Sequence, residues 1–110
     1  MRWENKQDIQ RDIAAIQKEL DETGELSKKT VQTIYEKDKN SSMRMRYYFW
    51  ASLCEEVPDA VKFFGGMGKV GGIYLPRCLL DMAKQKAFEE RISLSKLIRR
   101  LLIDYLKKPS

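Results

Sequence analysis

The sequence predicts a mainly α-helical protein in two parts: an N-terminal helical domain over residues 1–64, and a C-terminal strand–helix–helix unit over residues 69–108 that pairs with a second copy through one short antiparallel strand per chain. Apolar residues recur at three- and four-residue spacing, the period of an amphipathic helix. Five of the six glycines fall within residues 65–72, which predicts a joint. Residues 1–68 hold 11 Lys/Arg and 12 Asp/Glu, a net charge of −1, whereas residues 69–110 hold 10 and 4, a net charge of +6.

The N-terminal part reads as three helices with their own start and stop signals. The first helix carries an apolar stripe and is expected to end at Gly24, because glycine tolerates the left-handed conformation of a helix end. Ser27 can cap a second, shorter helix. Ser41 or Ser42 can cap a third helix that runs to about Glu56. The stripe of the first helix consists of Ile9, Ile13, Ile16 and Leu20.

The third helix contains an unusual run of aromatic residues beside Arg44 and Arg46. Basic residues interleaved with aromatic ones can grip a nucleic-acid strand by stacking on its bases. Helix geometry favours a different use, as anchors in the core or against a protein partner. The candidates for partner binding are Tyr47, Tyr48, Phe49 and Trp50.

The C-terminal unit begins with a short β-prone stretch that Pro76 ends, since proline lacks the N–H that a sheet ladder needs. One helix is expected from Arg77 to Arg91, and Ser93 can cap a second. A single strand leaves its backbone groups unpaired, and a unit of about 40 residues is near the lower limit for independent folding. Both problems disappear if two copies pair strand to strand above four helices. The expected dimer core is Ile73, Leu75, Leu79, Ala83, Ala87, Leu97, Ile98, Leu101 and Tyr105.

Several residues of this unit stand in the order and spacing of a known family. They are a β-stretch that ends in Leu75-Pro76, Leu79-Leu80 at the start of the first helix, Ala87 toward its end, and Ser93-x-Ser95-x-x-Ile98-Arg99. From about Lys69 to Leu106 the chain resembles the ribbon-helix-helix (MetJ/Arc-type) DNA-binding family. This resemblance implies that paired strands enter the major groove of DNA and that the last helix holds a phosphate at its N-terminus.

The resemblance also implies which residues face the DNA. The two-residue strand period, counted back from Leu75, places Tyr74, Gly72 and Val70 outward, toward the bases. The sequence departs from the family here, because family members commonly carry side chains that hydrogen-bond base edges. It departs again at Arg91, where a glycine is usual. The expected phosphate contacts are Ser93, Leu94, Ser95, Lys96, Lys69 and Arg77.

Composition excludes several classes of function. The chain has no histidine, which removes histidine-based catalysis and histidine metal ligands. Cys54 and Cys78 lack further ligands for a metal site and are expected to be ordinary small apolar residues. We therefore expect no enzyme, no metal and no cofactor. No apolar run approaches the roughly 18 residues of a membrane span, and the polar start is no signal peptide, so we expect a cytoplasmic protein without a membrane partner.

Two functions remain open. The first is a homodimeric, or higher oligomeric, protein that binds double-stranded DNA, as a repressor of its own promoter or as an accessory factor on plasmid or phage DNA. The second is a protein-interaction module, such as an antitoxin or inhibitor. In that case the aromatic N-terminal helices bind a protein partner and the C-terminal unit mainly dimerises.

Overall fold

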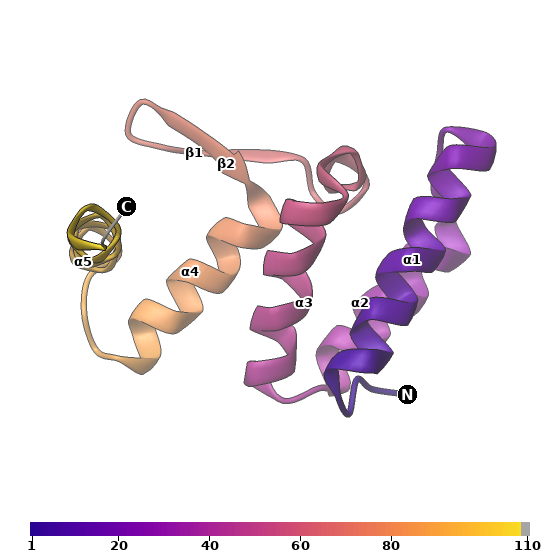
Figure 1. Ribbon diagram of the computed structural model, residues 1–110, viewed down its shortest axis with the longest axis horizontal. Coiled ribbons are helices and arrows are strands. Elements are labelled where there is room, and N and C mark those ends of the chain that lie inside the picture. The colour runs from indigo at the N-terminus through magenta and orange to yellow at the C-terminus, as the bar shows by residue number, and fades with distance from the viewer. Residues whose placement is uncertain (109–110) are drawn as a thin grey trace.

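The computed structural model describes residues 1–108 and confirms a mainly helical fold with one small antiparallel sheet (Figure 1). Three helices form the N-terminal half, and a short 3₁₀ helix leads from them into a β-hairpin and two further helices. The elements in chain order are α1 (Lys6–Thr23), α2 (Lys28–Asn40), α3 (Met43–Glu56), η1 (Pro58–Phe63), β1 (Met67–Val70), β2 (Ile73–Pro76), α4 (Arg77–Glu89) and α5 (Leu94–Lys107).

The helix ends in the N-terminal half follow the signals in the sequence. α1 ends at Gly24, whose φ of 75° is left-handed, as expected of a glycine cap. Ser27 caps α2 by accepting a hydrogen bond from the Thr30 N–H. Of the two serines that can cap α3, Ser42 does so. Ser41 instead accepts a hydrogen bond from the Trp3 N–H at 2.8 Å, which fastens the N-terminus to the end of α2.

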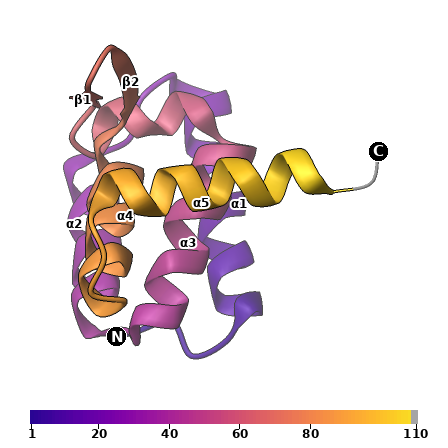
Figure 2. The same cartoon turned by 90° about the vertical axis from the view of Figure 1, so that its left-hand side faces the viewer.

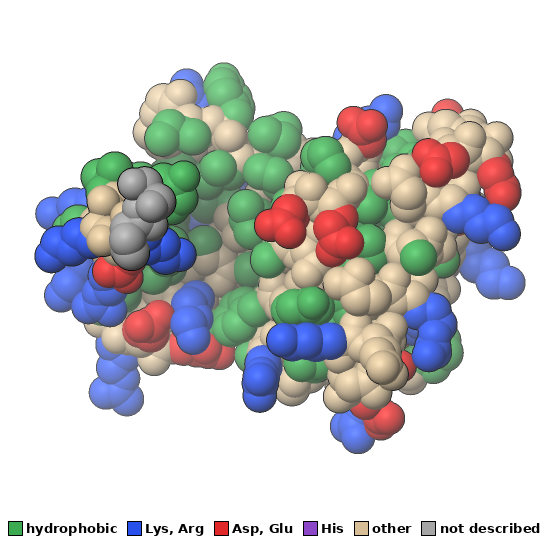
Figure 3. All heavy atoms as spheres, in the orientation of Figure 1, with side chains coloured by type: hydrophobic (Ala, Val, Ile, Leu, Met, Phe, Trp, Pro, Cys, Tyr) green, Lys and Arg blue, Asp and Glu red, His purple; other side chains and the backbone are tan. Residues whose placement is uncertain are grey.

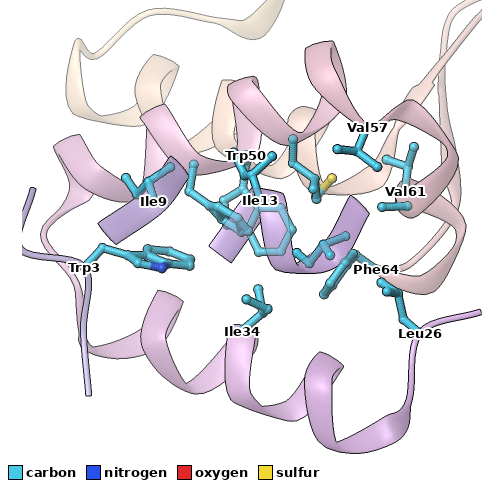
Figure 4. Packing of buried hydrophobic residues seen from close by; sticks show 14 residues of the cluster. Trp3, Ile9, Ile13, Leu26, Ile34, Trp50, Val57, Val61 and Phe64 are labelled. Carbon is cyan, nitrogen blue, oxygen red and sulfur yellow. The ribbon is translucent and has the colours of Figure 1, made fainter. Parts of the chain in front are cut away.

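α1, α2, α3 and η1 enclose an apolar core rich in aromatic rings (Figure 4). Phe49 and Trp50 are 0% and 2% exposed, so their prediction as partner-binding residues is wrong. The reason is that α3 packs against both α1 and α4, so it needs large side chains on more than one side. The buried cluster is Trp3, Ile9, Ile13, Ile16, Leu26, Ile34, Phe49, Trp50, Leu53, Val57, Ala60, Val61, Phe64 and Cys78.

One charged side chain, Asp38, lies buried beside this core at the end of α2. Its carboxylate accepts hydrogen bonds from Arg46 Nε at 2.9 Å and from a terminal nitrogen of the same guanidinium at 3.2 Å. It also accepts one from the indole nitrogen of Trp50 at 2.7 Å. These bonds satisfy the buried carboxylate and join α2 to α3.

The glycine-rich segment is a β-hairpin rather than a simple joint. β1 occupies residues 67–70 of the expected joint and pairs with β2, from Met67 opposite Pro76 to Val70 opposite Ile73. The prediction of a strand without a partner in its own chain is therefore wrong. Gly71 and Gly72 make the reversal possible, with Gly71 at a φ of 61°, because adjacent glycines suit a two-residue hairpin turn.

Gly68 allows the hairpin to lie directly on α4. A Cβ atom at this position would stand 3.0 Å from Cδ2 of Leu80 and 3.4 Å from Nε of Arg77. A larger residue would push the strand away from the helix. The close approach joins the hairpin to α4, and α4 in turn packs on α3, so the two expected parts of the chain are packed together.

α5 is the most isolated element of the described chain. It packs on α4 and then projects beyond the other helices, as the view in Figure 2 shows. The turn that leads into it contains Arg91 at a φ of 55°, the position where the family resemblance leads one to expect glycine. The Ile92 N–H donates to the Ala87 carbonyl at 3.0 Å and the Arg91 N–H donates to the Phe88 carbonyl at 3.1 Å, which is the bonding of a Schellman helix end.

Candidate nucleic-acid interface

The outer face of the hairpin carries Lys69 and Tyr74. These residues stand opposite each other on the two strands, and the Lys69 ammonium lies 5.7 Å from the centre of the Tyr74 ring. Because facing residues of a ladder share one side, Val70 and Ile73 lie on the opposite side, together with the buried Gly68.

The sequence-predicted outward row of Val70, Gly72 and Tyr74 therefore does not exist. The chain reverses at Gly71 and Gly72, so the two-residue period cannot be counted through them. Lys69, which the sequence assigned to a phosphate, takes the place beside Tyr74. The two-residue period places Tyr74 correctly on the side opposite Ile73 and Leu75 within β2. It misplaces Gly72 and Val70, because a turn interrupts the strand there.

The outer edge of β2 offers backbone hydrogen-bonding groups at one central residue. The Arg77 N–H donates to the Gly66 carbonyl at 2.8 Å, which marks a hydrogen-bonded pair just below the hairpin. Such pairs alternate with non-bonded ones along an antiparallel ladder, so the Lys69–Tyr74 pair is non-bonded. The N–H and C=O of Tyr74 therefore point away from β1, toward the free edge.

The predicted dimer core divides into buried and exposed residues. Ala87 and Leu97 are buried, and Leu75, Leu79, Ala83 and Ile98 are partly buried. Ile73, Leu101 and Tyr105 are 63%, 59% and 73% exposed. These three side chains are left uncovered by the rest of the described chain. Leu102 and Leu106, which are not among the predicted core residues, are exposed beside them.

These side chains form one apolar face on α5. At 100° per residue, Ile98, Leu101, Leu102 and Tyr105 lie within one side of the helix, while the buried Leu97 turns toward α4. An open groove of about 590 Å³ runs along this face, with Asp104 and Lys108 at its borders. Monomeric proteins rarely leave such a contiguous apolar surface uncovered.

The N-terminus of α5 is open to solvent. Ser93 caps it as predicted, since its hydroxyl oxygen accepts a hydrogen bond from the Lys96 N–H at 3.1 Å. The N–H groups of Leu94 and Ser95 lie in the first turn, where a helix provides no acceptor, and the helix dipole favours an anion there. Ser95 and Lys96 are exposed.

Basic side chains surround this end of the molecule, and Figure 3 shows Lys and Arg gathered around α5 and apolar side chains over the hairpin. Two of the basic residues also have contacts within the chain. The aliphatic part of Arg77 lies against Gly65, where its Cγ would stand 3.3 Å from an added Cβ. Arg100 forms an ion pair with Glu90 at 3.6 Å, which ties α5 to the end of α4.

A second surface involves the remaining two partner candidates, Tyr47 and Tyr48. They line an open groove of about 600 Å³ together with Met43 and Met45. Lys6 lies 4.9 Å from the Tyr48 ring centre, and Lys86 lies 5.5 Å from that of Tyr47. Burial, with the Glu89 carboxyl close by, raises the pKa of Tyr47 to about 12. The two methionines are not among the predicted partner-binding residues, although their spacing from the tyrosines on α3 indicates a shared region of the helix.

No family model, curated protein or solved structure matches this chain. Over residues 1–108, every helix is too short or too polar to cross a membrane. The same residues hold no group of three or more Cys, Asp or Glu side chains arranged to bind a metal ion. The function is therefore inferred from the residues and their geometry.

Proposed function

We propose that this protein is a homodimeric DNA-binding protein of ribbon-helix-helix type, whose hairpin, α4 and α5 contact the duplex. The observation that carries this proposal is that the most basic part of the chain contains two surfaces that no other described element covers. One is the apolar face of α5, and the other is the free edge of β2. Residues 69–110, which contain both, hold the net charge of +6.

A second copy of the chain fits both features at once. A two-fold axis beside Tyr74 lets its N–H and C=O pair with those of the partner's Tyr74, in an antiparallel arrangement. The resulting sheet has the order β1-β2-β2-β1. Covering the exposed part of a side chain such as Leu101, which is 59% exposed, contributes about 1–2 kcal/mol, so covering the whole α5 face favours association. An isologous contact of this kind closes on itself and yields a discrete dimer.

The dimer presents one basic surface to DNA. Lys69 and Tyr74 of both chains occupy the outer face of the sheet, where a lysine ammonium can donate to guanine and a tyrosine hydroxyl can hydrogen-bond a base edge. The first turn of α5, with Ser93, Ser95 and Lys96, supplies backbone donors and charge for a phosphate. Two units of +6 suit a duplex polyanion better than a small anionic substrate.

A DNA titration at graded salt tests this function. The probe is duplex DNA from upstream of the encoding gene, followed by a random duplex pool if the upstream DNA does not bind. We expect binding that weakens steeply as salt rises, because phosphate contacts release counterions. Absence of binding to both probes at low salt would contradict the proposal. The natural biological role is repression of the protein's own promoter or assembly of a complex on plasmid or phage DNA.

The dimer is tested separately by sedimentation of a variant with Leu101→Glu. A charge in the apolar face should shift the protein toward monomer, whereas the matched substitution Lys84→Glu on the exposed side of α4 should not. A wild-type protein that sediments as a monomer at high micromolar concentration would contradict the dimer.

The groove beside Tyr47 and Tyr48 supports the second candidate function, binding of a protein partner by an antitoxin or inhibitor. Methionine and tyrosine are adaptable anchors in protein interfaces, and Lys6, Arg44 and Lys86 border this groove. Co-expression with the product of the adjacent gene provides the test. A stoichiometric complex that Met45→Glu abolishes, in a protein without DNA affinity, would favour this function over DNA binding.

A further inference from the structure

The two cysteines of the chain, far apart in sequence, face each other across the junction of α3 and α4. Cys54 lies near the end of α3 and Cys78 lies in the first turn of α4. Their sulfur atoms are 3.8 Å apart and both thiols are free. Cys78 is buried, whereas Cys54 is only partly buried and remains open to a small solute. The pair results from the packing of α3 on α4, a contact that also places Cys78 in the main apolar core.

We propose that Cys54 and Cys78 form a thiol pair that a peroxide converts into an intramolecular disulfide. The sulfurs are already at van der Waals distance, and a disulfide bond of about 2.05 Å requires them to approach by about 1.8 Å. Rotation about the Cα–Cβ bond of either cysteine, which moves its sulfur, and a small shift of one helix can provide this. Nothing in this step depends on DNA binding, so it stands apart from the proposed function.

The surroundings assign different roles to the two sulfurs. Cys54 is the more accessible, so a peroxide meets it first. The hydrogen bond between the thiols lowers the pKa of Cys54, while the same bond and burial raise the pKa of Cys78. Cys54 is therefore the attacking sulfur, and Cys78 is the thiol that resolves the product.

The reaction balances with hydrogen peroxide as the oxidant. The Cys54 thiolate attacks one peroxide oxygen, the O–O bond breaks, and the released hydroxide takes up a proton as water. This leaves a sulfenic acid on Cys54. The Cys78 sulfur then attacks the Cys54 sulfur and displaces the hydroxyl group, which leaves as a second water with the Cys78 proton. Two thiols and one peroxide thus give one disulfide and two waters.

The bond would enclose η1 and the entire hairpin in one covalent loop, from residue 54 to residue 78. In the reduced protein, only non-covalent contacts hold α4 against α3. Oxidation would fasten the base of the hairpin and the start of α4 to the N-terminal helices. The sequence gives no sign of this pair, because 23 residues separate the cysteines and no periodicity links them.

Mass spectrometry of the full chain tests the proposal. The reduced protein is exposed to hydrogen peroxide, quenched, unfolded and alkylated. We expect a monomeric product 2 Da lighter than the reduced protein, with neither cysteine alkylated, and recovery of both alkylation sites after dithiothreitol. Two alkylatable thiols after peroxide treatment would overturn the proposal, as would a disulfide that only links two chains.

Single variants test the assigned roles. In Cys78→Ser, oxidation should stop at a sulfenic acid on Cys54 that dimedone traps. In Cys54→Ser, the buried Cys78 should react roughly tenfold more slowly with peroxide than Cys54 does. Equal reactivity of the two variants would refute Cys54 as the attacking sulfur. Circular dichroism of both variants establishes that they are folded, and the wild-type mass measurement stands if either is not.

Discussion

Replacing Arg91 by glycine should stabilise the protein. Arg91 holds a φ of 55° at the end of α4, where the helix closes with hydrogen bonds from the Ile92 and Arg91 N–H groups to the Ala87 and Phe88 carbonyls. This helix end requires a left-handed residue, and in that conformation the Cβ of an L-residue crowds the following carbonyl oxygen. Glycine has no Cβ and adopts it freely.

The expected gain follows from two opposed effects. A left-handed conformation costs an L-residue about 1–2 kcal/mol. Glycine loses more backbone freedom than other residues on folding, which destabilises the folded state by about 0.5–1 kcal/mol and offsets part of this gain. The net stabilisation is about 1 kcal/mol, which raises Tm by about 4 °C in a chain of 110 residues.

Thermal unfolding followed by circular dichroism, at one fixed protein concentration, measures this difference. Arg91→Ala is the matched control, because it removes the same charge and side chain but keeps the Cβ. Arg91→Ala should raise Tm little or not at all. If Arg91→Ala raised Tm as much as Arg91→Gly does, the charge rather than the backbone would be responsible, and the reasoning from φ would be refuted.

Three other outcomes are expected. Asp38→Ala should lower the free energy of unfolding in urea by about 3 kcal/mol, because Arg46 loses its buried partner. Trp50→Phe removes only the indole hydrogen bond to Asp38 and should lower it less. Equal losses would contradict the role given to the Asp38–Arg46 ion pair. Lys96→Ala should weaken DNA binding across sequences and reduce by about one the slope of log binding constant against log salt concentration. Tyr74→Ala should instead alter the sequence preference found in a binding selection. An unaltered preference would refute the assignment of Tyr74 to the DNA-facing side of the hairpin. Hydrogen bonds from the Ser27 N–H and the Thr30 hydroxyl lower the pKa of Glu19 from 4.5. The ionised Glu19 therefore stabilises the folded state above pH 4.5, and this stabilisation is lost as the pH falls through the lowered pKa. Glu19→Gln should make the free energy of unfolding less dependent on pH in this acid range.

Helix positions were predictable from the sequence because their signals are local. Gly24 and Ser27 act on residues within one turn of themselves, so their effect does not depend on the rest of the fold. The same applies to Ser93 at the start of α5. These residues set the helix boundaries independently of tertiary packing.

The hairpin escaped prediction because the glycine cluster assigns Gly71 and Gly72 to a joint instead of a two-residue turn, and because the contact of β1 with α4 is tertiary. Gly68 indicates a flexible joint when read in sequence, yet it is a buried strand residue that lets β1 approach Leu80. The aromatic run shows the same limitation. Helical spacing cannot say that Phe49 faces the core while Tyr48 borders a groove, because that depends on how many neighbours α3 has.

The position of α5 determines how the chain should behave when it is dilute. Its second half gains little from packing on α4, and an isolated helix of fewer than about 12–15 residues is marginal in water. The backbone amides around Tyr105 should therefore exchange with deuterium quickly in a lone chain and slowly once a second copy covers them. Amides beside Phe49 should exchange at one rate throughout. A higher protein concentration would then order the C-terminal half of α5 through dimerisation, while the N-terminal core stays unchanged.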